Sequence, residues 1–259
     1  MTVRPTFARA LALGLAGLLI QVSTATAAEV HVMISGGFTA AYEALAPGFE
    51  AMTGDKLVTV QAPSMGTSPT AIPNRLAAGE PADVLIMVGE ALDGLIAQGK
   101  ALPAGRTNLA NSRIGLSVKA GAPKPDISTV DAFRRALVAA KSIAYSDSAS
   151  GVYVGTEMFA KLGIADQVGP RARKIVAERV GAVVARGEAE IGFQQIAELL
   201  PVPGADFVGP IPPSLQKVTV FSAGVAANSK NPDRARALIA YLASPASLQT
   251  ILKTGLEKP

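Results

Sequence analysis

Three short stretches of this sequence combine serine or threonine with glycine directly after an apolar run. They are Ser35-Gly36-Gly37, Ser64 to Ser68, and Ser148 to Gly151. Hydroxyl groups and unpaired backbone N–H groups at the start of a helix bind anions without a full positive charge. One such turn is an ordinary feature of an α/β protein, whereas three of them predict a common anion-binding cleft.

A few longer side chains could complete this cleft. Arg179 begins a predicted helix. The sequence is equally compatible with its side chain lying in the cleft and with its lying on the surface. Gln194 ends a strand and could donate or accept a hydrogen bond, as could Tyr153, although a tyrosine in this setting is more often part of the core. Asp83 and Asp147 could act as bases, but such carboxylates more often cap or pair locally.

Several kinds of catalytic site lack the residues they need. A serine triad requires an imidazole, and the one histidine, His31, is four strand positions from Ser35, roughly 13 Å along an extended chain. The chain has no cysteine, which excludes disulfides and thiol chemistry, and one histidine without cysteine argues against a zinc or copper site. No P-loop, dinucleotide fingerprint or G-x-S-x-G motif is present. We therefore predict no metal and no cofactor, and identify no catalytic residue.

The elements that must position these residues alternate along the chain. Strands are predicted at 30–34, 56–60, 83–88, 113–118, 142–145, 189–193 and 217–227, and most of them are followed by an amphipathic helix. This rhythm predicts an α/β fold of mostly parallel sheets flanked by helices, with a ligand cleft between two lobes. We expect the first lobe to comprise residues 28–111 and 229–259, and the second lobe residues 112–228.

The first 27 residues have the pattern of a secretory signal peptide. Arg4 and Arg9 precede the apolar run from Ala10 to Val22, and Ala25-Thr26-Ala27 offers a cleavage site of small residues. Cleavage before Ala28 leaves 22 basic and 20 acidic residues in scattered positions. We expect a periplasmic monomer that is not embedded in a membrane, and the lack of a basic run argues against nucleic acid as a partner.

Several of these strings resemble the periplasmic molybdate-binding proteins of ABC importers. The resemblance rests on Ser35 before a helix, on Gly66 to Asp83 (GTSPTAIPNRLAAGEPAD), on Asp147 to Gly151 with Tyr153, and on Arg179-Val180-Gly181-Ala182. Its most specific piece is Arg75 to Asp83. It implies a type II periplasmic binding fold that holds an oxyanion without metal. Together with the side chains considered above, the resemblance implies the following ligand-binding residues: Ser35, Gly36, Gly37, Ser64, Met65, Gly66, Thr67, Ser148, Ser150, Gly151, Tyr153, Arg179, Val180 and Gln194.

Two positions depart from that family's pattern. Gln194 stands where the family typically has tyrosine, and the first turn reads Ser35-Gly36-Gly37-Phe38 instead of Ala-Ser-Leu. An altered pocket could take a larger carboxylate. The strings SGGF, PSMGT and GFQQ are also similar to periplasmic aconitate isomerases of the same fold, a resemblance that implies allylic proton transfer between trans- and cis-aconitate.

The sequence thus supports two hypotheses. The first is a solute-binding protein that captures a small polyanion, either an oxyanion or a di- or tricarboxylate, for an ABC permease. The second is an aconitate isomerase, which we rank lower because the sequence offers no unmistakable base.

Overall fold

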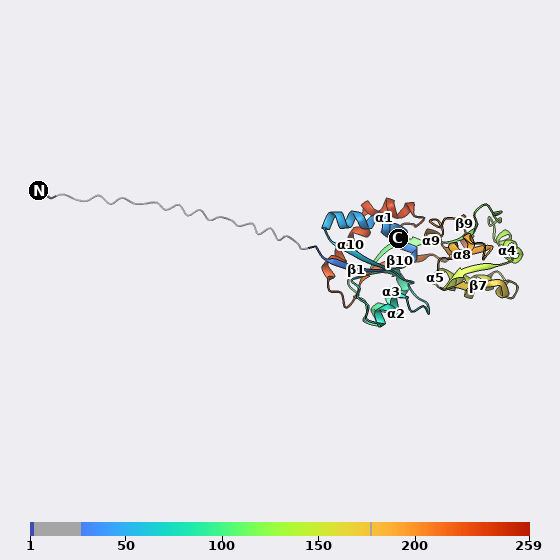
Figure 1. Cartoon of the computed structure of the whole chain (residues 1–259), viewed down its shortest axis with the longest axis horizontal. Coiled ribbons are helices and arrows are strands. Elements are labelled where there is room, and N and C mark those ends of the chain that lie inside the picture. The colour runs from blue at the N-terminus through green and yellow to red at the C-terminus, as the bar shows by residue number, and fades with distance from the viewer. Residues whose placement is uncertain (3–26, 177) are drawn as a thin grey trace.

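Two five-stranded sheets, each covered by helices, form two lobes that lie side by side (Figure 1). The computed structural model describes residues 1–2, 27–176 and 178–259. The predicted signal peptide, residues 1–27, lies almost entirely outside the described residues. The two-lobed α/β fold is confirmed.

The first lobe is built on a sheet with the strand order β2-β1-β3-β10-β4. β1 pairs in parallel with β2 and with β3, and β10 pairs antiparallel with β3 and with β4. The strands are β1 (Glu29–Ile34), β2 (Lys56–Gln61), β3 (Val84–Val88), β4 (Thr107–Ser112) and β10 (Thr219–Val225). The helices are α1 (Gly36–Thr53), α2 (Ile72–Ala77), α3 (Gly89–Ala97), α10 (Pro232–Leu242) and α11 (Pro245–Lys253).

The central strand β3 shows why this sheet is covered on both faces. All five of its residues are buried. Alternate side chains of a strand point to opposite faces: Val84, Ile86 and Val88 pack with α1 and α10, whereas Leu85 and Met87 pack with residues of α2 and α3. An uninterrupted apolar run is therefore needed here, as in any strand buried between two helical layers.

The second lobe repeats the arrangement with the strand order β7-β6-β8-β5-β9. β6 pairs in parallel with β7 and β8, and β5 pairs antiparallel with β8 and β9. The strands are β5 (Ile114–Lys119), β6 (Ile143–Ser146), β7 (Ala172–Ile175), β8 (Ile191–Gln195) and β9 (Ala205–Pro210). The helical elements are α4 (Val130–Ala139), α5 (Ala149–Tyr153), the π-turn η1 (Val154–Met158), α6 (Phe159–Lys161), α7 (Ala165–Val168), the 3₁₀ turn η2 (Gly169–Arg171), α8 (Val180–Ala185), α9 (Ile196–Leu199) and the 3₁₀ turn η3 (Pro213–Leu215).

Both sheets are mixed rather than mostly parallel, because each contains two antiparallel pairings beside two parallel ones. In each sheet the antiparallel pairs involve a strand next to a crossing between the lobes. β4 leads into β5 through Arg113, and the chain returns through residues 216–218 into β10.

The chain therefore re-enters the first lobe earlier than we predicted, because the prediction placed residues up to 228 in the second lobe. β10 pairs with β3 and β4 of the first sheet, and Phe221, Ala223 and Val225 belong to the first lobe's core. The sequence shows that 217–227 is a buried strand, but an apolar strand fits either sheet equally well, and its partners are decided by tertiary packing.

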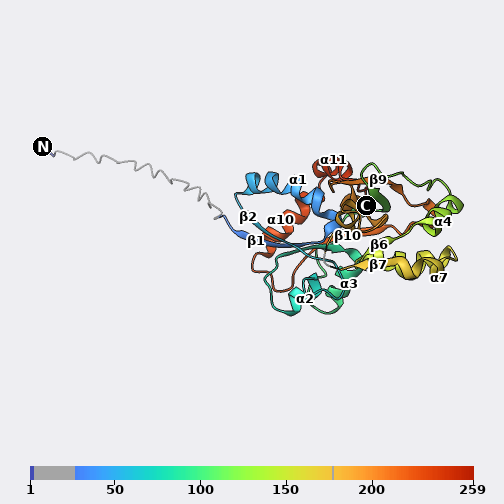
Figure 2. The same cartoon turned by 45° about the vertical axis from the view of Figure 1, so that its right-hand side comes forward.

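The helix α9 brings the second lobe against the first. It follows β8 of the second sheet, yet Ala197 packs in the core cluster of the first lobe, beside α1. The C-terminal helices α10 and α11 also pack on α1 (Figure 2), and the Tyr241 hydroxyl donates a hydrogen bond to the Leu45 carbonyl at 3.2 Å. No helix among the described residues is long and apolar enough to cross a membrane.

Candidate functional site

A cavity of about 230 Å³ lies between the two lobes. Since a water molecule takes up about 30 Å³ of liquid, this is room for a small ligand. The first lobe lines it with Ser35, Gly36, Gln61, Ala62, Pro63 and Thr70. The second lobe lines it with Ser146, Asp147, Ser148, Ile175, Val176, Glu178, Arg179, Gln194 and Glu198.

The start of α1 forms one wall of this cavity. Ser35 is the N-cap, with extended backbone angles (φ −88°, ψ 147°), and its side chain makes no capping hydrogen bond. The first N–H groups of the 18-residue helix are therefore left without an intrahelical partner, at the positive end of the helix dipole. This wall favours negative charge.

Glu198 of α9 occupies that positive end. A Cβ atom built on Gly36 would lie only 2.2 Å from the Glu198 Oε1 atom, so the carboxylate is in direct contact with the glycine backbone. Any larger residue at position 36 would displace the carboxyl group. The glycine at this position is thus explained by the close approach of the acid.

Burial raises the pKa of Glu198 to about 7, against an ordinary value of 4.5. The positive charge of Arg179 and hydrogen bonds from the Gln194 side chain and the Gln195 backbone oppose this rise. Desolvation of the charged form therefore dominates. A carboxyl group with a pKa near 7 can both accept and return a proton at neutral pH.

Gln194 connects Glu198 to the opposite wall. Its Oε1 atom accepts a hydrogen bond from the Val180 backbone N–H at 2.9 Å, and its Nε2 group donates to Glu198 Oε1, also at 2.9 Å. The first bond fixes the orientation of the amide, so that its N–H groups and not its oxygen face the acid. The side chain is 4 % exposed, which leaves it little freedom to turn.

The other charged groups in the cavity differ in their partners. Asp147 pairs with Lys174 (2.8 Å) and Glu178 pairs with Arg186 (2.8 Å). Among the described residues, Arg179 makes no hydrogen bond through its side chain and no ion pair within 4 Å, and Glu198 likewise has no ion pair within that distance. Among the described lining residues, Arg179 and Glu198 are therefore the cation and the acid without an ion-pair partner within 4 Å.

Five residues of the predicted site line the cavity together, namely Ser35, Gly36, Ser148, Arg179 and Gln194. They come from the ends of strands in both sheets and from the first residues of the helices that follow. Val180 lies directly behind them, buried, with its N–H bound to Gln194. Of the three turns predicted to share a cleft, those at Ser35 and Ser148 line this cavity.

The Ser64 to Ser68 turn lies beside the cavity and contributes little to its lining. The Ser64 hydroxyl is fully buried and accepts a hydrogen bond from the Val88 N–H at 2.9 Å, so it braces two strand ends. Met65 lines a separate hollow, and Thr67 is exposed. Gly66, with a φ of +110°, rests against the backbone and carboxylate of Asp147 from the other lobe.

The remaining predicted residues have packing roles. Gly37 lies against the ring of Phe221, and Gly151 against the backbone of Ser146, whose hydroxyl also bonds with that of Ser150 at 3.2 Å. Tyr153 is 2 % exposed, and its hydroxyl donates to the Leu215 carbonyl at 2.7 Å. It is therefore part of the second lobe's core and absent from the cavity lining.

Sequence reasoning missed Glu198, and it assigned Asp147 to a local role only. Gln194 and Glu198 are four residues apart, across the step from β8 into α9. An acid one turn into a short helix after a strand end is a detectable signal. Its contact with Gly36, however, depends on packing between segments that are far apart in the chain.

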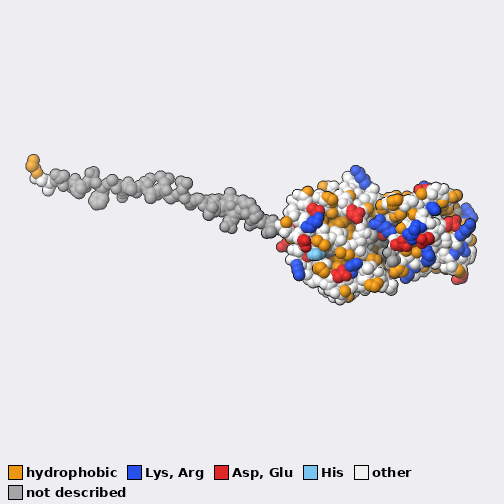
Figure 3. All heavy atoms as spheres, in the orientation of Figure 1, with side chains coloured by type: hydrophobic (Ala, Val, Ile, Leu, Met, Phe, Trp, Pro, Cys, Tyr) orange, Lys and Arg blue, Asp and Glu red, His pale blue; other side chains and the backbone are white. Residues whose placement is uncertain are grey.

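The face of the molecule shown in Figure 3 has no large area of a single charge sign. Basic and acidic side chains are interspersed over both lobes.

Comparisons with known proteins place the chain. The family model described as bacterial extracellular solute-binding protein matches residues 30–257. A Pseudomonas protein named aconitate isomerase is 48 % identical over 255 residues, which is 97 % of each chain. Among solved structures, the periplasmic molybdate-binding protein of Azotobacter vinelandii is 21 % identical with a TM-score of 0.72, covering 89 % of this chain and 99 % of that one.

The sulfate-binding protein SubI of Mycobacterium tuberculosis is 15 % identical with a TM-score of 0.69, covering 88 % of this chain and 86 % of that one. These two structural likenesses concern the fold, and the family match covers nearly all of the chain after residue 29. The chain belongs to the family of bacterial extracellular solute-binding proteins.

Proposed function

We propose that the protein binds a small polycarboxylate of the aconitate class between its lobes and interconverts its trans and cis forms. The observation that carries the proposal is Glu198, an acid with a pKa of about 7 that lines the same cavity as Arg179 and the start of α1. The relative named aconitate isomerase, at 48 % identity, supports the same reaction. We also propose that it acts in the periplasm as a monomer, after removal of residues 1–27.

The reaction is an allylic proton shift. Ionised Glu198 removes a proton from the methylene carbon of the tricarboxylate, and the electron pair spreads over the allylic system toward the neighbouring carboxylate. Protonated Glu198 then donates this proton to the former vinylic carbon, where the electron pair forms the new C–H bond. The double bond thereby moves by one position, and Glu198 returns to its ionised state. Arg179 and the N–H groups at the start of α1 stabilise the negative charge that develops.

The test is turnover of trans-aconitate by the purified chain without residues 1–27, with cis-aconitate followed by chromatography. We expect turnover in the wild type and a loss of about a hundredfold or more in Glu198→Gln, since general acid–base groups contribute 10²–10⁴-fold. Wild-type protein that binds trans-aconitate without turning it over would contradict the isomerase.

Capture of the anion for delivery to an ABC permease is the second candidate function. It is favoured by the family and by the hydroxyl and N–H groups of Ser35, Gly36 and Ser148 in the cavity. It predicts thermal stabilisation by a bound carboxylate or oxyanion, at least a few degrees at saturating ligand, with no chemical change in the ligand recovered from the protein.

A further inference from the structure

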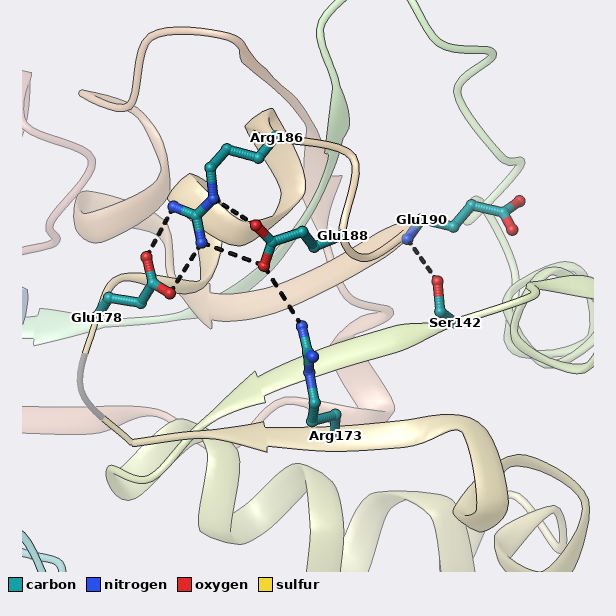
Figure 4. Close-up of polar contacts among 6 residues, drawn as sticks. All are labelled: Ser142, Arg173, Glu178, Arg186, Glu188 and Glu190. Carbon is teal, nitrogen blue, oxygen red and sulfur yellow. Dashed lines mark hydrogen bonds and ion pairs between the residues drawn. The ribbon is translucent and has the colours of Figure 1, made fainter.

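Four side chains of alternating charge, from Glu178 at the cavity to Arg173 of β7, form one network on the second lobe (Figure 4). The Arg186 guanidinium binds both carboxylate oxygens of Glu178, at 2.8 and 2.9 Å, and also contacts Glu188 at 2.6 Å. Arg173 of β7 reaches Glu188 at 3.8 Å. The figure shows Arg186 between the two glutamates, with Arg173 below them.

This network joins the two ends of the helix α8. Glu178 comes two residues before the first residue of the helix, and Arg186 is its C-cap. Between Glu178 and the helix lies Arg179, the N-cap, whose side chain lines the cavity. The ion pair therefore fixes the backbone on one side of Arg179, and the bond from the Val180 N–H to Gln194 fixes it on the other.

Among the described residues, the Arg179 guanidinium makes no hydrogen bond and no ion pair within 4 Å, although its charge acts on Glu198. The direction of this side chain therefore depends on how its backbone is held. Single exposed ion pairs stabilise little, but a bidentate arginine–carboxylate pair within a network is the geometry that does order a segment.

We propose that the Glu178–Arg186–Glu188–Arg173 network positions Arg179 for the carboxylate of the bound ligand. Glu178 and Arg186 are positioning residues, and Arg179 is the group that touches the ligand. The inference rests on the proposed function in one respect, that the cavity is where the polycarboxylate binds. It adds a support for Arg179 that extends from the cavity lining at Glu178 to residues outside it.

The test is a double-mutant cycle on the affinity for trans-aconitate, measured by titration calorimetry with the chain lacking residues 1–27. We expect Arg186→Gln to weaken binding about fivefold and Arg179→Gln about fiftyfold. If Arg186 acts through Arg179, the double variant matches Arg179→Gln within about twofold. Arg186→Lys, which keeps the charge and loses the bidentate geometry, should resemble Arg186→Gln.

Controls separate this role from plain stabilisation of the helix. Arg236→Gln breaks an exposed ion pair with Asp233 (2.7 Å) on α10 and should leave the affinity unchanged. Raising the salt concentration screens exposed pairs, so it should weaken ligand binding more steeply in the wild type than in Arg186→Gln.

Effects of the two substitutions that multiply in the double variant would overturn the inference, as would unchanged affinity in Arg186→Gln. Both results leave the proposed function intact, because the wild type still binds. Failure of wild-type protein to bind trans-aconitate would overturn the proposed function and this inference together.

Discussion

Replacing Glu198 by glutamine tests the central acid without any knowledge of the ligand. In the folded chain burial raises the pKa of Glu198 from 4.5 to about 7, and each pKa unit corresponds to about 1.4 kcal/mol. The folded state therefore binds this proton more tightly than the unfolded state does. Between pH 4.5 and pH 7 its stability falls as the pH rises, by about 3 kcal/mol in total.

Glutamine cannot ionise, so the stability of Glu198→Gln should lack this fall between pH 4.5 and pH 7. We therefore expect the variant to be more stable than the wild type at pH 8. For a chain of this size about 3 kcal/mol corresponds to roughly 6–12 °C in the midpoint of thermal unfolding. The assay is thermal unfolding of both proteins without ligand from pH 5 to pH 8. Glu90→Gln, at an exposed position on α3, is the matched control. Parallel curves for wild type and Glu198→Gln across this range would refute the assignment of a raised pKa to Glu198.

Three further substitutions probe the surroundings of this acid. Gly36→Ala places a Cβ atom 2.2 Å from Glu198 Oε1 and forces the carboxyl away, so we expect kcat/KM to fall about a hundredfold, and unaltered kinetics would show that the contact is dispensable. Gln194→Met removes the hydrogen bond that favours the charged form, which raises the pKa of Glu198 further and should move the acid limb of the kcat/KM profile to higher pH; a limb that stays in place would exclude Glu198 as the titrating group. Tyr153→Phe leaves the Leu215 carbonyl without its donor and should lower stability by about 1–2 kcal/mol in urea unfolding, with kcat unchanged, whereas a loss of turnover would return Tyr153 to the site.

The sequence predicts the position of a strand where burial on both faces restricts its residues to apolar ones. The fully apolar β3 and the start of β1 are recognisable from their side chains, because a strand between two helical layers has no other choice of residues. β4 reads TNLANS and β9 reads ADFVGP. Neither has a marked apolar pattern, and each pairs through its backbone with a neighbour that supplies the burial. They form because they pair with β10 and β5, and no local sequence pattern reveals that pairing.

The residues of the cavity also differ in whether the sequence alone could identify them. Ser35, Gly36 and Ser148 were predictable because a strand that ends in small polar residues before a helix presents its N–H groups locally. Glu198 was not, because its raised pKa comes from the packing of α9 on α1, between residues more than 150 positions apart. The sequence predicts which turns bind an anion, and only the fold shows that Glu198 lies in the same cavity.

A final prediction follows because the ligand and Glu198 interact with the same positive groups in the cavity. Arg179 and the start of α1 favour an anion, but ionised Glu198 already carries one there, and like charges in one cavity repel. Asp147 and Glu178, which also face the cavity, are neutralised by Lys174 and Arg186. Affinity for trans-aconitate should therefore fall as the pH rises through 7, and Glu198→Gln should abolish this component of the fall. A protein made only to capture anions gains nothing from an acid at this position, whereas an isomerase needs its ionised form as the base. An identical pH dependence of affinity in both proteins would contradict this account and favour capture alone.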